Sequence, residues 1–382
     1  MSLTVLRPPS VTGNATAFWW QPGPEDDPVS TGIEALRKAI HGDHPHSGMD
    51  FLRWFLSGTN PAGAGGGVVI VRGEEVMGFA GLAPRQIRID ASDRLAAWGF
   101  DYMVSRQIGS AGSARYALKL ANIWTDAANE MGFDLRVSCP NAKSQKMILS
   151  RHVKWSSVGH PVLMVRPLRR RRGARRRTGL ARSAAMGTAG LGLDLLTGAR
   201  AAIAGRIGGE MRMLDLGRLA DRAAIDALWN RRKDDRTVSL VRDAANLAWR
   251  YTSHPVWTYH VAGQEREGHL EALAVTCQRE IDGWPAVLLV DALMDPARTG
   301  DNAALVGRLV RRAAADGAVI AAAECIPGTA LARALRRAGF AAVPRRFDPK
   351  PFHITVRDTL GQSPSLCDLG SWSFAWGDID VV

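Results

Sequence analysis

A run of arginines in the middle of the chain restricts the fold more than any other sequence feature. Residues 166–182 hold nine arginines and no acidic residue, which is typical of a connecting segment. The full length of 382 residues also exceeds the roughly 150 residues of an average domain. We therefore expect two domains, over residues 1–167 and 211–382, joined by an Arg-rich and then Ala/Gly/Leu-rich linker over residues 168–210.

The same run accounts for most of the charge of the chain. The formal net charge is +12, and residues 166–182 contribute +9, so all other residues together carry only +3. The basic character belongs to one segment, which argues against a domain that binds nucleic acid over its whole surface. The composition, 46% hydrophobic and 23% charged, matches globular proteins and excludes a fibrous or wholly disordered chain.

Cysteine and histidine spacing gives no sign of a disulfide scaffold or a metal site. The four cysteines form no CxxC or Cys/His pattern, which favours a reducing compartment. His44 and His46 lie in a Gly/Pro loop without fixed ligand geometry, so we expect a polar surface loop there and no metal. Neither a signal peptide nor an apolar run of about 18 residues is present, so we expect a cytoplasmic protein that does not span a membrane.

Hydrophobic periodicity predicts an α/β (α+β) chain in which one order of elements occurs twice. The segment LRWFLSGTNPAG at Leu52 and the segment LAWRYTSHPVWT at Leu247 each end a helix before a hairpin, although two amphipathic helices can match by coincidence. The predicted helices cover 31–40, 49–56, 114–131, 142–151, 219–231, 241–249, 303–316 and 330–337, and the predicted strands cover 68–72, 76–82, 95–104, 135–138, 160–165, 257–261, 271–278, 286–291 and 318–323.

A glycine-containing loop follows the strand predicted at 95–104. Small residues between Arg106 and Ser113 allow several backbone N–H groups to point at one spot at the start of a helix, where a phosphate is stabilised. A plain strand-to-helix turn explains the same glycines. The loop lacks the Gly-Lys-Ser/Thr of a Walker A motif and the spacing of a Rossmann fold.

These residues carry a resemblance to the GNAT N-acetyltransferase superfamily. RQIGSA at Arg106 resembles its pyrophosphate-binding signature, the hairpin VVIVRGEEVMGFAGLAPRQIRI at Val68 resembles its second and third strands, and SCPNAKSQKMIL at Ser138 resembles its Pro-Asn-x-x-Ser element. The resemblance covers residues 30–167, although MVSRQIGSAGS is shortened and lacks the usual proline. Residues 211–382, which end in SWSFAWGDIDVV, resemble a second domain, as in tandem proteins found with bacterial cell-surface polysaccharide genes.

The resemblance implies two mixed, mostly antiparallel sheets flanked by helices and a reaction of acetyl-CoA or another acyl-CoA with an amine. It implies that the cleft between strands four and five holds the thioester. Asp101 is then the catalytic base and Tyr102 the acid, unless Asp101 instead pairs with Arg106 or caps a turn. The implied cofactor-binding residues are Arg106, Gln107, Ile108, Gly109, Ser110, Ala111, Gly112, Asn141 and Ser144, of which Asn141 and Ser144 also fit simple helix N-capping.

The second half departs from this pattern. Its loop over residues 295–302 has no Gly-x-Gly/Ala spacing, and Asp301 there would oppose a pyrophosphate. Asp291 occupies the position that matches Asp101. We expect the first domain to bind acyl-CoA and the second to be a degenerate copy that shapes the substrate site or an interface.

The predicted function is an N-acyltransferase that acts on an amino sugar or another primary amine, as a small molecule or linked to lipid. The alternatives are a non-catalytic tandem scaffold and a Fem-type transferase that uses aminoacyl-tRNA. Arg169–Arg177 would attract an anionic membrane surface at the inner face of the cell membrane, although a solvated connector fits equally well. Nucleic acid is disfavoured because no aromatic residues alternate with these arginines.

Overall fold

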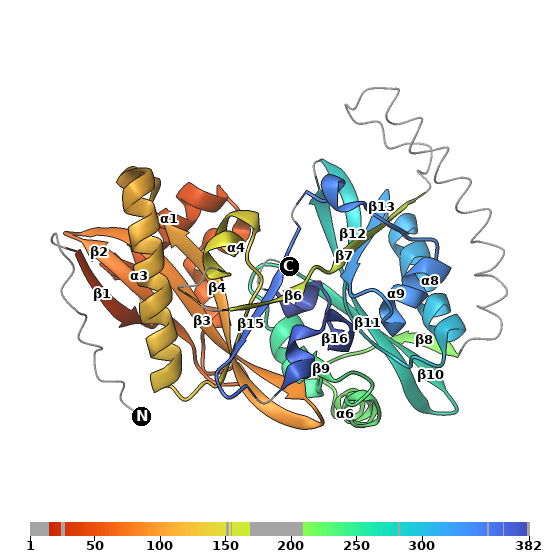
Figure 1. The fold of residues 1–382 in the computed structure, drawn as a ribbon. Coiled ribbons are helices and arrows are strands. Elements are labelled where there is room, and N and C mark those ends of the chain that lie inside the picture. The colour runs from red at the N-terminus through yellow and green to blue at the C-terminus, as the bar shows by residue number, and fades with distance from the viewer. Residues whose placement is uncertain are drawn as a thin grey trace. The chain divides into compact units, whose positions relative to one another are not determined.

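The computed structural model describes residues 15–23, 27–149, 153, 155–168, 209–281, 283–349, 351–361 and 363–379. The chain forms two units (Figure 1). Unit 1 comprises residues 1–159, 253–256 and 352–369, and unit 2 comprises residues 160–252, 257–351 and 370–382. The predicted membrane-binding segment Arg169–Arg177 lies outside the described residues.

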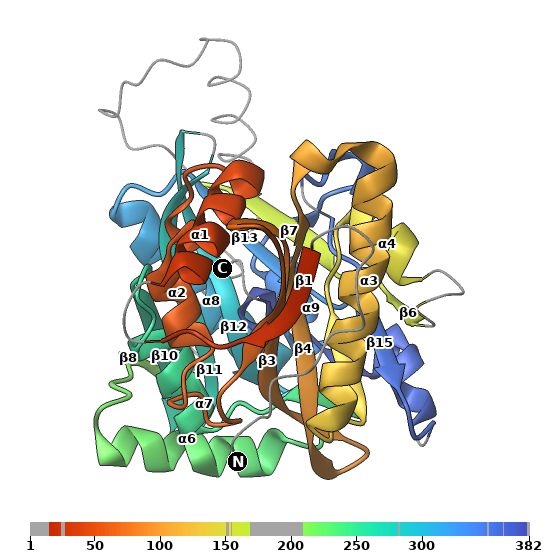
Figure 2. The ribbon, with the colours of Figure 1, turned by 90° about the vertical axis from the view of Figure 1, so that its left-hand side faces the viewer.

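Unit 1 is built on seven strands in a row, among which β4 and β5 are parallel and the other neighbouring pairs are antiparallel. Figure 2 shows α1 and α2 on one face of the sheet and α3 on the other. The strands follow the order β1 (Ala15–Trp20), β2 (Gly66–Arg72), β3 (Glu75–Ile89), β4 (Ser92–Val104), β5 (Leu135–Ser138), β15 (Ile354–Asp358) and β6 (Ser156–Gly159), and the helices are α1 (Pro28–His41), α2 (Met49–Phe55), α3 (Gly109–Glu130) and α4 (Ala142–Ile148).

Unit 2 has a sheet with the same sequence of strand directions, in which only β12 and β13 are parallel. Helices α8 (Thr299–Ala315) and α9 (Ala330–Arg337) pack against it through Leu305, Leu309 and Leu335. The strands follow the order β8 (Glu210–Met213), β10 (Tyr259–Arg266), β11 (His269–Ile281), β12 (Trp284–Met294), β13 (Ile320–Cys325), β7 (Val162–Pro167) and β14 (Ala341–Ala342); further elements are α6 (Leu219–Arg232), α7 (Ala244–Leu247), β9 (Val238–Leu240) and β16 (Trp372–Ser373).

These sheets confirm the predicted fold class, an α/β chain with two mixed, mostly antiparallel sheets flanked by helices. Two strands belong to a different unit than a division of the chain at the linker would give them. β7 precedes the linker and pairs with β13 of unit 2, while β15 follows it by more than a hundred residues and pairs with β5 of unit 1. We call β7 and β15 the exchanged strands. Each one pairs with backbone groups that would otherwise lie at an open edge of its sheet.

Of the two histidines for which the sequence predicts a polar surface loop, His44 is exposed as expected but His46 is buried. His46 is only 5% exposed, and its ring stacks on Phe51 at a centroid distance of 4.6 Å. His254 lies 5.3 Å from His46 and 4.5 Å from Trp54, between ring centroids. His46 therefore belongs to an aromatic core of unit 1, in which Phe51 is near in sequence and His254 is about two hundred residues away.

Candidate functional site

The parallel strands β4 and β5 of unit 1 separate at a defined point. Their last paired residues are Gly99 and Ser138, whereas β4 stays paired with β3 as far as Val104. Beyond Gly99 the edge of β4 that faces β5 therefore has no strand partner. Such an edge offers backbone N–H and C=O groups to a bound molecule.

Asp101 lies two residues past this separation, at a β-bulge. The register of β4 against β3 shifts between Phe79 and Gly81, and Asp101 adopts a left-handed φ of +47°. A left-handed non-glycine residue is strained, and such strain concentrates at functional sites. The bulge turns the Asp101 side chain toward α1 rather than toward Arg106, the partner considered from the sequence.

On α1, Asp101 meets two residues. Its Oδ2 accepts from Nε of Arg37 at 2.7 Å, and its Oδ1 lies 3.4 Å from Nε2 of His41. Burial opposes ionisation of Asp101, but Arg37 and His41 outweigh it and hold the pKa of the carboxyl below its ordinary value. The side chain of His41 is 45% exposed, so an imidazole that is accessible to solvent contacts a buried, ionised carboxylate.

Tyr102, the next residue, lies on the α3 side of the sheet. Its hydroxyl donates to the carbonyl oxygen of Ala117 on α3, and its ring packs on the core around Leu120 and Trp124. Burial raises the pKa of the phenol well above 10. Tyr102 anchors α3 to β4, and Asp101 and Tyr102 point to opposite faces.

The glycine loop forms a short 3-10 turn that runs directly into α3. Arg106 and Gln107 are exposed, Ile108 is the N-cap residue, and Gly109 has a φ of +74°. An added Cβ at Gly109 would meet no atom, so backbone conformation, not space, requires glycine there. Ser110, Ala111 and Gly112 form the first helical turn, although nothing is described of the Ser110 and Ala111 side chains. The helix begins five residues earlier than its periodicity predicts.

Asn141 begins α4. Its side-chain oxygen accepts from the backbone N–H of Ser144 at 3.0 Å, which is the geometry of an N-cap. Asn141 is exposed and Ser144 is half-buried. The capping role considered from the sequence is present.

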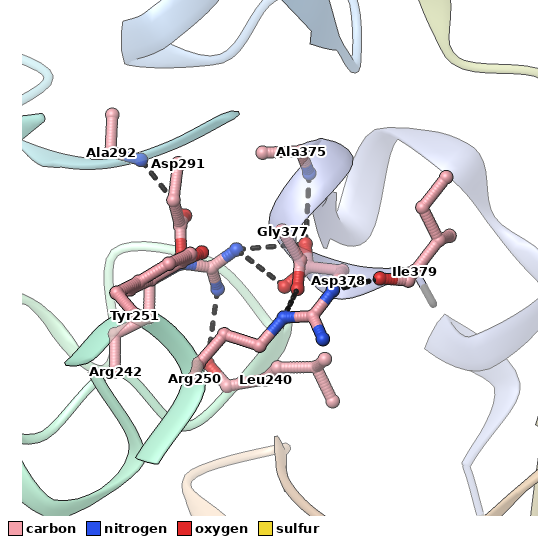
Figure 3. Close-up of polar contacts among 10 residues, drawn as sticks. All are labelled: Leu240, Arg242, Arg250, Tyr251, Asp291, Ala292, Ala375, Gly377, Asp378 and Ile379. Carbon is pink, nitrogen blue, oxygen red and sulfur yellow. Dashed lines mark hydrogen bonds and ion pairs between the residues drawn. The ribbon is translucent and has the colours of Figure 1, made fainter. Parts of the chain in front are cut away.

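Unit 2 has the same separation of parallel strands, at Leu289 of β12 and Ala323 of β13. Asp291 lies two residues past this separation, again at a bulge, but its described partners are buried groups of unit 2 (Figure 3). Its Oδ1 accepts from Nε of Arg242 at 2.7 Å and its Oδ2 from the hydroxyl of Tyr251 at 2.8 Å. Arg242 also donates to both carboxylate oxygens of Asp378 at 2.8 Å.

This network fixes the end of the chain within unit 2. Arg250 donates to the carbonyl oxygens of Gly377 and Ile379, and Asp378 accepts from the amide of Ala375 (Figure 3). A Cβ at Gly377 would lie 1.9 Å from the Tyr251 hydroxyl, so only glycine fits. The Gly-Asp of the C-terminal motif therefore acts as a structural clamp.

An aspartate lies in the loop before α8, and another lies in the first turn of this helix. Asp295 accepts from the amide of Ala297 at 2.8 Å, and Asp301 accepts from Arg266 at 2.9 Å. Carboxylates thus already use groups that a phosphate would need. In α3, by contrast, the first turn contains no acidic residue.

Beside the unpaired part of β12, unit 2 contains a cavity of about 60 Å³. Its walls include Met294 of β12, Leu331 of α9 and Phe374, with Arg236 among its polar lining.

A buried carboxyl group lies next to the point where β12 and β13 separate. Glu324 of β13 follows Ala323, the last paired residue, and is only 2% exposed. Burial, then the charge of Asp348, raise the pKa of Glu324 to about 8.

Sequence reasoning missed Arg37, His41, Arg242 and Glu324. Arg37 and His41 are more than fifty residues from Asp101, and no local motif links them. The one available signal was the pairing of Asp101 with Asp291, since a buried aspartate at a matched position requires a cation partner in each unit.

Comparisons with solved structures show which proteins share this fold. A probable N-acyltransferase from Enterococcus faecalis V583 has 10% identity and a TM-score of 0.56, over 90% of this chain and 73% of that one. N-myristoyltransferase of Saccharomyces cerevisiae with bound myristoyl-CoA has 11% identity and a TM-score of 0.60, over 92% and 85%. A GCN5-related N-acetyltransferase from Anabaena variabilis ATCC 29413 has 9% identity and a TM-score of 0.59, over 90% and 73%.

At sequence identities of 9–11%, these similarities show a shared fold alone. No protein-family model matches the sequence, and no curated protein matches it significantly. Among the described residues, no helix has the length and apolar content needed to cross a membrane.

Proposed function

We propose that the protein is an acyl-CoA-dependent N-acyltransferase of tandem GNAT architecture whose reaction takes place in unit 1. The observation that carries this proposal is the separation of β4 from β5 after Gly99 and Ser138, followed directly by the glycine turn and α3. The free edge of β4 would hold the acyl thioester, and one of its backbone N–H groups would polarise the carbonyl. The likeness in fold to N-acyltransferases supports the reaction class.

The donor proposed for unit 1 is acetyl-CoA or another acyl-CoA. The first turn of α3 carries the positive end of a 22-residue helix, and Gly109 lets the backbone approach a pyrophosphate closely. Arg106 and Gln107 are exposed beside it, where they could donate to phosphate oxygens. The acidic loop before α8 supports the assignment of the donor to unit 1 and the degenerate state of unit 2.

The proposed base is the pair of Asp101 and His41. An acceptor amine arrives as an ammonium ion and must lose a proton before its lone pair attacks the carbonyl carbon, after which CoA leaves as the thiolate. Asp101 stays ionised because its pKa is lowered, and a carboxylate of this kind orients an imidazole well. With Nε2 of His41 facing Asp101, Nδ1 would take the proton.

Tyr102 is the acid suggested by the sequence, and Tyr102→Phe tests that role. An acid that protonates the leaving thiolate would be needed for turnover but not for stability. An anchor of α3 would instead be needed for stability, because the variant removes the hydrogen bond that joins Tyr102 of β4 to the Ala117 carbonyl of α3. Parallel kcat and urea-unfolding measurements separate the two roles.

The acceptor we propose is an amino sugar or another primary amine, free or lipid-linked, used in cell-surface polysaccharide assembly. The sequence resemblance to tandem proteins found with cell-surface polysaccharide genes supports this acceptor. The arginines over residues 169–177 would hold such an enzyme at anionic lipid. Flotation with vesicles of anionic and of zwitterionic lipid tests this; equal recovery with both would contradict it.

The decisive experiment is isothermal titration of the full chain with acetyl-CoA and with free CoA. The full chain is required because β15 supplies a strand to the sheet of unit 1, so a truncation at the linker would leave that sheet incomplete. Gly109→Val should abolish binding. Gly132→Val is the matched control, because Gly132 lies at the other end of α3 with a φ of +77° and equally open space.

Two outcomes would contradict the proposal. If the wild type binds neither ligand, the non-catalytic scaffold or the aminoacyl-tRNA-dependent transferase takes its place. If Gly109→Val and Gly132→Val lose binding equally, the loss reflects backbone strain and not contact with the pyrophosphate.

A further inference from the structure

Two arginines of unit 2 converge at the rim of the cavity beside β12. The carbonyl oxygen of Gly328 accepts from Nη2 of Arg236 at 2.7 Å and from Nη1 of Arg333 at 2.6 Å. Arg236 lines the cavity, and Arg333 also donates to the carbonyl oxygen of Pro296, which lines it as well. Arg236 also donates through Nη1 to the carbonyl oxygen of Gly370 at 2.7 Å. Two half-buried guanidinium groups thus share one neutral acceptor, and an anion bound between them would offset their mutual repulsion.

The other arginines of this cavity are already neutralised. Arg242 is paired with Asp291 and Asp378, and Arg232 lies 2.8 Å from Asp295. Across the described part of the chain, no carboxylate comes within 4.0 Å of the guanidinium of Arg236 or Arg333. The partners of Arg236 and Arg333 are neutral backbone carbonyl oxygens, so both guanidinium groups keep a net positive charge that can attract an anionic ligand.

We propose that unit 2 contains a binding site for a phosphate ester, with the phosphate held by Arg236 and Arg333. Two guanidinium groups match the double charge of a phosphate or diphosphate and can donate to it in pairs. The uncharged end of the ligand enters the cavity between Met294, Leu331 and Phe374, which present apolar surface. This site is separate from the donor site in unit 1 and stands without it.

The test uses the full chain and inorganic pyrophosphate as the first probe. Isothermal titration should show binding that weakens as salt is added, and Arg236→Ala with Arg333→Ala should weaken it at least tenfold. Arg312→Ala with Arg345→Ala is the control, because this double substitution removes the same charge from unit 2. Both arginines are exposed, and neither lines the cavity. Wild-type affinity in the Arg236/Arg333 variant, or equal losses in both double variants, would overturn the site.

Coenzyme A and a nucleoside diphosphate sugar then distinguish two sources of the phosphate. If the Arg236/Arg333 variant loses the sugar ligand and keeps CoA, the phosphate belongs to the acceptor. If it loses CoA while Gly109→Val keeps CoA, the site is supported and the donor assignment to unit 1 fails. If pyrophosphate binds but neither larger ligand depends on these arginines, the proposed ester site is wrong. Failure here leaves the acyltransferase proposal standing, because Gly109→Val tests that proposal separately.

Discussion

The fourth strands of the two units carry an aspartate at the same place and surround it differently. Asp101 and Asp291 each lie two residues beyond the last parallel pair, at a bulge. Asp291 has Arg242, the Tyr251 hydroxyl and a backbone amide as partners. Asp101 has Arg37 and an imidazole that is accessible to solvent, and its backbone is left-handed.

The difference shows how one position can serve two purposes. In unit 2 the carboxylate is saturated by internal donors, and the network holds the end of the chain. In unit 1 a strained backbone directs the carboxylate to a group that reaches solvent. The same position is thus next to a solvent-accessible imidazole in unit 1 and within an internal hydrogen-bond network in unit 2.

Arg242→Ala should have the largest effect, because it leaves Asp291 and Asp378 buried without their cation. Breaking a buried pair costs about 3–5 kcal/mol, and here two carboxylates lose the same partner. Urea unfolding monitored by tryptophan fluorescence measures the free energy of unfolding. Arg312→Ala, an exposed arginine, is the control, and a loss below about 1 kcal/mol for Arg242→Ala would refute the clamp.

Glu324→Gln should change how stability depends on pH. Glu324 of β13 stands one residue past the strand separation, where unit 1 has Cys139. Because folding raises its pKa from 4.5 to about 8, its contribution is fully present below pH 4.5 and is lost as the pH rises through about 8. The variant should remove that loss, so unfolding at pH 5 and pH 9 should differ less than in the wild type. An unchanged difference would show that Glu324 ionises normally.

Arg37→Ala should destabilise the protein less than Arg242→Ala, because it leaves one buried carboxylate without its cation and not two. We expect about 2–3 kcal/mol, the range for a hydrogen bond to a charged group. Acyl transfer should also be lost if Asp101 orients His41. The double variant Arg37→Ala, Asp101→Asn should recover part of the stability and none of the activity. Equal destabilisation by Arg37→Ala and Arg242→Ala would break the comparison between the two units.

Much of the fold was predictable because its signals are local. The β2–β3 hairpin, α9 at Ala330–Arg337 and β5 at Leu135–Ser138 follow from periodicity and glycine placement. The exchanged strand β15 was missed, since its short run ITVRD resembles a loop until β5 and β6 pair with it on both sides. Pairing between segments more than two hundred residues apart has no local signature.

The positions of the two strand separations and their aspartates were predictable, but the partners of these aspartates were not. The strand-loop-helix order and the matched aspartates located both strand separations. The partners Arg37 and Arg242 come from different elements, a helix and the segment after β9, so no shared spacing could reveal them. The direction of the Asp101 side chain depends on a bulge, and a shift of one residue reverses the face on which a side chain lies.

The smallest expected effects concern the caps of the helices that follow β5 and β13. Asn141 of α4 is exposed and bonds to the Ser144 amide, whereas Thr329 of α9 is 6% exposed and bonds both to the Ala332 amide and to the Ile326 carbonyl. Asn141→Ala should therefore cost about 0.5–1 kcal/mol and Thr329→Ala about 1–2 kcal/mol in urea unfolding. If Asn141 also contacts the donor, Asn141→Ala should weaken CoA binding by more than this small loss of stability explains, while Thr329→Ala should not. Equal CoA affinity in both variants would limit Asn141 to the capping role.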